Sequence, residues 1–105
     1  MKKKIIVVTG GSGRFGKILK KTNNHNRLHF PTKNQLNILD EKKINNYLNK
    51  VNPDVLIHLA GLSRPMKEHH KDINKSINLN IIGTANITKA CNKLKIKLIY
   101  FSTNY

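Results

Sequence analysis

Short runs of apolar residues recur along the chain, and polar residues do not alternate within them. Runs of this kind are typical of strands that are covered on both faces of a sheet. The first run is β-branched, whereas the second is weaker and is stopped by Pro31. A very short candidate edge strand comes after that proline. The predicted strands are 3–8, 27–30, 35–38, 55–59 and 96–101.

Between these runs, apolar residues recur at three- and four-residue steps, which predicts helices. A first helix is expected over 14–21, with Phe15, Ile18 and Leu19 on one face. A second is expected to begin after Asp40 as its N-cap. Its apolar positions are Ile44, Tyr47, Leu48 and Val51. A long third helix over 73–94 is marked by Ile73, Ile77, Ile81, Ala85, Thr88 and Cys91.

Strands that alternate with helices predict an α/β fold with a parallel sheet and right-handed crossovers. The chain of 105 residues fits one domain, or part of one, with a modest core. We therefore expect a Rossmann-like, doubly wound sheet. The chain shows no internal repeat and no linker.

The chain is strongly basic, with 20 basic and five acidic residues and a net charge of +15. Clustered Lys and Arg would favour a nucleic-acid partner. Here the lysines are spread along the chain among asparagines, and only three basic residues are Arg. The few aromatic residues are not interleaved with them as stacking platforms. We therefore favour a solvated basic surface, which would also concentrate anionic ligands such as dinucleotides.

Cellular location is inferred from the apolar runs and the cysteine content. No apolar run approaches the length of a membrane span, and the run after Met1–Lys4 is too short for an export signal. The single cysteine, Cys91, lies among residues with helical spacing and is expected to be a buried, reduced thiol. These features predict a cytoplasmic protein with no membrane partner.

Three glycines at a spacing of three residues follow the first predicted strand and lead into the first predicted helix. Gly10 allows a sharp turn out of the strand, Gly13 lets a phosphate approach the backbone, and Gly16 lets the helix pack close to the sheet. The N–H groups around Arg14 and Phe15 would be unpaired at a helix start, where an anion is favoured. A flexible turn is the alternative, but the strand–glycine–helix context favours the pyrophosphate of a dinucleotide.

The segment from Thr9 to Gly16 resembles the fingerprint of the extended short-chain dehydrogenase/reductase family, the NAD-dependent epimerases, dehydratases and reductases. Segments 53–61, 80–86 and 101–105 resemble later motifs of that family and occur in the same order. Segments 36–40 and 102–105 are most similar to the dTDP-4-dehydrorhamnose reductases, which reduce a 4-keto sugar nucleotide with a nicotinamide cofactor. Those reductases usually have Asp where this chain has Asn37 and Asn104.

The resemblance implies roles for individual residues. Gly10, Gly13, Arg14, Phe15 and Gly16 would hold the cofactor pyrophosphate. Asn37 and Ile38 would flank the adenine, and Ala60 and Gly61 would lie beneath the ribose. Thr103 would be the catalytic hydroxyl, with Ser102 beside it at the cofactor. Asn80 and Gly83 would either contact the cofactor or serve helix packing.

The choice of cofactor depends on charge after the second strand. An acidic residue there would pair with the ribose hydroxyls of NAD and repel a 2′-phosphate. Thr32 and Lys33 stand in that neighbourhood, with no acidic residue beside them. The sequence therefore leans toward NADP(H) over NAD.

The family's Tyr-x-x-x-Lys pair, which supplies the proton, does not occur in this sequence. Val51 stands four residues after Tyr47, and Asn104 stands four residues after Tyr100. We therefore expect 1–105 to be the N-terminal part of a dinucleotide-binding Rossmann domain without its substrate domain, inactive alone. It would bind a nucleotide-sugar only if completed by further chain. The alternatives are a non-catalytic nucleotide-binding or regulatory module and a fragment of a nucleotide-sugar epimerase or dehydratase.

Three further expectations concern lesser features. The bare edge of the last strand would favour self-association. Glu68, His69, His70 and Asp72 form a solvated loop rather than a metal site, because adjacent side chains rarely converge on one ion. His58, at the end of an apolar strand, is expected to be packed and hydrogen-bonded rather than a base.

Overall fold

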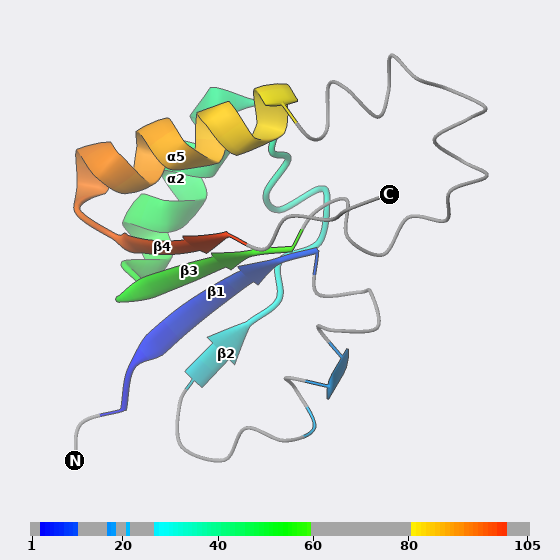
Figure 1. Cartoon of the computed structure of the whole chain (residues 1–105), viewed down its shortest axis with the longest axis vertical. Coiled ribbons are helices and arrows are strands. Elements are labelled where there is room, and N and C mark those ends of the chain that lie inside the picture. The colour runs from blue at the N-terminus through cyan, green and yellow to red at the C-terminus, as the bar shows by residue number, and fades with distance from the viewer. Residues whose placement is uncertain (1–2, 11–16, 19–20, 22–26, 60–80, 101–105) are drawn as a thin grey trace, which may run out of the picture.

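The computed structural model describes residues 3–10, 17–18, 21, 27–59 and 81–100. Within them, four strands form one parallel sheet: β1 (Ile5–Thr9), β2 (Arg27–His29), β3 (Val55–His58) and β4 (Lys97–Tyr100). The strand order is β2-β1-β3-β4 (Figure 1). The chain thus passes from β1 to β2 on one side and returns to β3 on the other. This Rossmann-like arrangement confirms the predicted fold class.

Helices α2 (Glu41–Val51) and α5 (Gly83–Leu94) lie over the same face of the sheet (Figure 1). Their apolar sides meet the alternate strand residues that point toward them, because side chains along a strand alternate between faces. The core between these layers consists of Val7, Leu36, Ile38, Ile44, Leu48, Leu56, Ile87, Ala90, Cys91 and Ile96. No helix among the described residues is long and apolar enough to cross a membrane.

Helix α2 begins where its sequence predicts and ends at a residue with left-handed backbone. The Asp40 side chain accepts a hydrogen bond from the Lys43 N–H at 3.2 Å, which confirms the predicted N-cap. Ile44 and Leu48 are buried one turn apart on the face toward the sheet. The helix ends where Asn52 adopts a left-handed conformation with φ of 51° and its N–H bonds the Leu48 carbonyl.

The start of β3 is fixed to the start of β1 by Asp54. Its carboxylate accepts a hydrogen bond from the Ile5 N–H at 2.9 Å, and its own N–H donates to the Ile5 carbonyl at 2.8 Å. The pairing then continues in register, so that Thr9 lies opposite His58 at the far end. The carboxyl ends of β1 and β3 therefore reach the same edge of the sheet.

The predicted edge strand over 35–38 is wrong. The N–H groups of Gln35 and Leu36 both bond the Thr32 carbonyl, which folds this segment into a turn instead of a ladder. Leu36 and Ile38 are nevertheless buried in the core. These residues are apolar because they pack beneath the helices. A short apolar run looks the same in the sequence whether it packs in this way or forms a strand.

The last predicted helix is confirmed over α5, but most of the residues whose spacing marked it do not lie on its buried face. Ala85 and Thr88 are exposed, and Ile81 keeps 64% of its surface exposed. The residues that α5 buries are Gly83, Ile87, Ala90 and Cys91. The four-residue spacing of isoleucines selected a neighbouring face, because a glycine that packs closely gives no hydropathy signal. Residues 73–80 of the predicted helix lie outside the described residues.

Cys91 is a free, buried thiol, as predicted. Burial raises its pKa to about 11, because desolvation disfavours the thiolate. Cys91 is therefore protonated at neutral pH and contributes to the core as a small apolar side chain.

Two further predictions are only partly covered by the described residues. Of the predicted helix 14–21, Lys17, Ile18 and Lys21 have helical backbone, and Ile18 is exposed. Strand β4 forms one edge of the described sheet, and Tyr100 at its end keeps 43% of its surface exposed. Self-association through this edge stays a prediction.

Gly83 provides a direct test of the packing of α5. A Cβ at this position would lie 2.5 Å from Cδ1 and 2.8 Å from Cγ1 of Ile38. We expect Gly83→Ala to lower the free energy of unfolding by about 1–2 kcal/mol, because overpacking outweighs the gain in helix propensity. In an Ile38→Ala background, which removes both atoms, the same change should become neutral or stabilising. Urea unfolding measures both; stabilisation by Gly83→Ala in the unaltered chain would contradict this packing.

Candidate nucleotide-binding site

The candidate site lies at the carboxyl ends of the parallel strands. There the connection from β1 leads to β2 on one side, and the connection from β3 leads to β4 on the other. Ligands of open α/β sheets bind at such a switch point because the two loops that leave it separate to opposite sides. Here the switch point lies between β1 and β3. Thr9, His58 and Tyr100 stand in one row across β1, β3 and β4 at this edge.

His58 is the centre of this row and is completely buried. Its Nδ1 lies 2.7 Å from the Thr9 hydroxyl, and its Nε2 lies 3.1 Å from the hydroxyl of Thr84 on α5. Its ring stacks on that of Tyr100, with centroids 5.3 Å apart and an interplanar angle of 23°. The prediction of a packed, hydrogen-bonded histidine is confirmed.

The His58 ring is neutral at physiological pH. Desolvation by burial lowers the pKa of this imidazole to about 4. A neutral imidazole has one N–H donor and one bare nitrogen acceptor, and a hydroxyl complements either. The ring therefore joins β1 to α5 through both nitrogens.

Gly10 follows Thr9 and begins the glycine-rich loop. Its φ of 78° is left-handed, a conformation that favours glycine, which agrees with the predicted sharp turn. The Thr9 carbonyl accepts a hydrogen bond from the Leu59 N–H at 2.9 Å, so β1 and β3 stay joined up to this turn. Gly13, Arg14, Phe15 and Gly16 lie outside the described residues, and their contact with a pyrophosphate stays a prediction.

The turn after β2 presents the residues expected at the ribose of a cofactor. The Thr32 N–H donates to the Gln35 side chain at 2.9 Å, which fixes the turn locally. Thr32 and Lys33 are both exposed. No carboxylate occurs between Phe30 and Leu39, so the only formal charge in that stretch is the Lys33 ammonium.

Asn37 and Ile38, predicted to flank an adenine, are held by well-defined contacts. The Asn37 side-chain oxygen accepts a hydrogen bond from the Leu39 N–H at 3.0 Å. Ile38 is buried against Gly83, and its carbonyl accepts a hydrogen bond from the Asn86 side chain at 3.0 Å. These contacts show that Gly83 serves helix packing; the adenine role of Asn37 and Ile38 stays a prediction.

Sequence reasoning missed the parts that Thr84 and Asn86 play. Thr84 bonds a histidine 26 positions earlier in the chain, and Asn86 bonds a carbonyl 48 positions earlier. Both stand in segment 80–86, whose similarity to a family motif was the one available signal. Neither residue type nor spacing identifies such distant partners.

Several predicted site residues lie outside the described residues. They are Ala60, Gly61, Asn80, Ser102 and Thr103, together with the loop that holds Glu68, His69, His70 and Asp72. Within the described part of the chain, no group of three or more His, Cys, Asp or Glu side chains could hold a metal ion.

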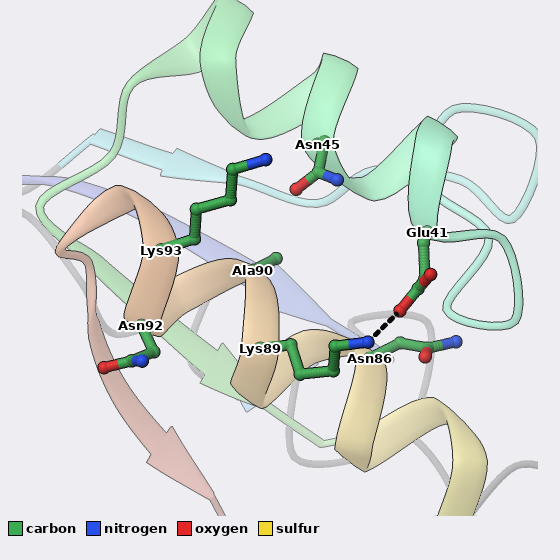
Figure 2. A pocket seen from close by; sticks show the side chains of 7 residues that line it. All are labelled: Glu41, Asn45, Asn86, Lys89, Ala90, Asn92 and Lys93. Carbon is green, nitrogen blue, oxygen red and sulfur yellow. Dashed lines mark hydrogen bonds and ion pairs between the residues drawn. The ribbon is translucent and has the colours of Figure 1, made fainter.

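A separate hollow of about 400 Å³ lies between α2 and α5 (Figure 2). The ammonium of Lys89 bonds the Glu41 carboxylate at 2.8 Å there, and the buried Asn45 side-chain oxygen has no hydrogen-bond partner among the described residues. The remaining lining residues are Asn86, Ala90, Asn92 and Lys93. None of these is a residue predicted to bind the cofactor, so the strand ends remain the candidate site.

The lowered pKa of His58 predicts how stability depends on pH. Because the pKa is about 4 in the folded chain against 6.5 for an exposed histidine, the unfolded chain binds the proton more tightly. The stabilising contribution is therefore full above pH 6.5 and is lost as the pH falls toward about 4, by up to about 3 kcal/mol. Unfolding with urea at several pH values measures this loss.

A matched pair of variants assigns that pH dependence to His58. His58→Gln should flatten the decline between these pH values, because glutamine does not titrate. His29→Gln, at an exposed histidine of β2, should keep the decline of the unaltered chain. If the free energy of unfolding declines equally with falling pH in the unaltered chain and in His58→Gln, the assignment is refuted.

Comparisons with known proteins agree with this geometry. The family described as RmlD substrate binding domain matches residues 3–105. The dTDP-4-dehydrorhamnose reductase of Mycolicibacterium smegmatis is 30% identical over 103 residues, which cover 95% of this chain and 30% of that protein. Methionine adenosyltransferase 2 subunit beta of Bos taurus is 27% identical over 110 residues, which cover 95% of this chain and 32% of that protein.

Solved structures of similar proteins include two with bound cofactor. The dTDP-4-dehydrorhamnose reductase of Bacillus anthracis in complex with NADP has a TM-score of 0.89 and 25% identity, covering all of this chain and 38% of that one. RMD of Pseudomonas aeruginosa complexed with NADPH has a TM-score of 0.75 and 25% identity, covering 97% of this chain and 35% of that one. This chain spans about a third of the length of its relatives. It belongs to the RmlD substrate-binding-domain family, a dTDP-4-dehydrorhamnose-reductase-like branch of the extended short-chain dehydrogenases/reductases.

Proposed function

We propose that this chain binds a nicotinamide dinucleotide at the β1–β3 switch point, as the NAD(P)-binding portion of a nucleotide-sugar oxidoreductase. The observation that carries the proposal is the left-handed turn at Gly10, immediately after the end of β1. A left-handed glycine at the end of the first strand is what a loop that wraps a pyrophosphate at the strand ends requires. The bound NADP of the Bacillus anthracis reductase, which has the same fold, supports this cofactor class.

NADP(H) is the favoured cofactor. The turn after β2 has the exposed Lys33 and no carboxylate to repel a 2′-phosphate. The reductase of Bacillus anthracis and RMD of Pseudomonas aeruginosa contain NADP and NADPH, respectively, which supports the same choice. The high positive charge of the chain adds a general attraction for either dinucleotide.

Binding is tested by titrating the purified chain with NADPH and with NADH in a calorimeter. We expect NADPH to bind more tightly than NADH. Lys33→Ala should weaken the affinity for NADPH about three- to tenfold and leave the affinity for NADH unchanged. Lys50→Ala, at an exposed lysine in the last turn of α2, is the matched control and should change neither affinity. The absence of binding by either dinucleotide would refute the proposal.

The chemistry proposed for the complete enzyme is reduction of a 4-keto sugar nucleotide. The nicotinamide would supply the hydride, and the Thr103 hydroxyl would hydrogen-bond the substrate carbonyl oxygen as negative charge develops on it. Protonation of that oxygen requires an acid of suitable pKa, and these 105 residues contain no Tyr-x-x-x-Lys pair. The chain alone therefore has the binding half of the machinery and lacks the proton donor.

We accordingly expect no measurable NADPH oxidation when the purified chain is mixed with dTDP-4-dehydrorhamnose. Absorbance at the nicotinamide band follows the reaction, with a complete dTDP-4-dehydrorhamnose reductase as the positive control. Turnover by the chain itself, above the rate with heat-denatured protein, would overturn this expectation.

A non-catalytic subunit is the second candidate function. The similarity to methionine adenosyltransferase 2 subunit beta favours it, because that relative is named as a subunit of another enzyme. The DNA downstream of codon 105 distinguishes the two candidates. Continued coding through a Tyr-x-x-x-Lys would support the reductase, whereas a stop codon would support the module.

A further inference from the structure

We propose that His58 is a positioning residue of the nucleotide crevice, which holds the end of β1 and the first turn of α5 in fixed relation. The inference rests on the proposed dinucleotide site, which it deepens. His58 is not offered as a catalytic residue, because its nitrogens are both engaged by protein hydroxyls. It would act on the cofactor through the backbone that it holds.

The geometry joins three elements through one ring. Thr9, on Nδ1, is the last residue of β1 and immediately precedes the Gly10 turn. Thr84, on Nε2, is the second residue of α5. Tyr100, at the end of β4, covers the ring face. A displacement of α5 therefore reaches the origin of the glycine-rich loop through two hydrogen bonds.

Position matters here because a binding site loses affinity when its groups shift by about 0.5 Å. The Gly10 turn has no side chain with which to anchor itself. Three contacts restrain Thr9 just before it: the hydrogen bond from the Leu59 N–H to its carbonyl, the His58 ring on its hydroxyl, and a longer hydrogen bond of 3.4 Å from that hydroxyl to the Ile57 carbonyl. The first holds the strand end within the sheet, and the second fixes it against the helix layer.

The surroundings of the ring favour its neutral form. β1 and α5 present hydroxyls to it, from Thr9 and Thr84, and β4 presents the phenol of Tyr100. Among the described residues, no carboxylate contacts the ring to compensate a positive charge. A proton on His58 would therefore lack a countercharge among these groups, and the ring holds Thr9 and Thr84 in its neutral form.

The test uses isosteric threonine variants of the full chain. Thr84→Val removes the hydroxyl at Nε2 while keeping the side-chain volume. Thr88→Val is the matched control one turn later, because its exposed hydroxyl donates only to the Thr84 backbone carbonyl. We expect Thr84→Val to raise the dissociation constant of NADP⁺ about fivefold, and Thr88→Val to change it less than twofold, at a temperature where all chains remain folded.

A double-mutant cycle separates positioning from a general loss of stability. Thr9 and Thr84 occupy opposite nitrogens of one ring, so releasing either should loosen the hold of the ring on the other. The double variant Thr9→Val/Thr84→Val should therefore weaken the binding of NADP⁺ no more than the single variant with the larger effect. Additive losses in affinity, or equal losses in Thr84→Val and Thr88→Val, would overturn the inference.

A second readout needs no cofactor and separates this inference from the proposed function. In the free chain, Thr84→Val should shift the Gly10 amide resonance, whereas Thr88→Val should not. If the unaltered chain binds no NADP⁺ but Gly10 responds in this way, the proposed function fails and the mechanical link stands. An unshifted Gly10 resonance in Thr84→Val overturns the link, whatever the cofactor does.

Discussion

The arrangement of the site depends on one buried imidazole, because each of its two nitrogens needs a hydrogen-bond partner. A polar ring without access to water is costly unless each nitrogen has a partner. In this chain the partners are the hydroxyls of Thr9 and Thr84, which come from a strand and a helix on either side of β3. Satisfying His58 thus requires β1, β3 and α5 to meet in one way at the carboxyl edge of the sheet.

The second constraint is the close approach of α5 to the turn after β2. Gly83 leaves room for Ile38, and Asn86 bonds the Ile38 carbonyl, so the helix is held to that turn by both shape and a hydrogen bond. The same turn continues back to Thr32 and Lys33, the residues proposed to face the cofactor ribose. One helix therefore holds both sides of the proposed crevice: β1 through His58, and the turn after β2 through Ile38.

Local signals in the sequence predicted the layers, but not their contacts. The β-branched runs gave the strands and Asp40 gave the start of α2, because each depends on neighbours a few residues away. Segment 35–38 was assigned wrongly as a strand, and the spacing that marked the last helix does not follow the buried face of α5, because packing against distant residues decided both. The Gly10 turn was predicted, since only its own backbone requires it. The pairing of His58 with Thr84 arises from the fold and has no local signature.

Membership of the family supports the proposal that these constraints serve a nucleotide site, and the proposed site can be mapped directly. The most direct measurement is a map of backbone amide shifts as NADP⁺ is added to the labelled chain. The account predicts that the shifts gather at the strand ends, on Gly10, Leu59, Thr32 and Lys33. Shifts gathered instead in the hollow between α2 and α5, on Asn45 and Lys93, would contradict it, as would a spectrum unchanged by saturating cofactor.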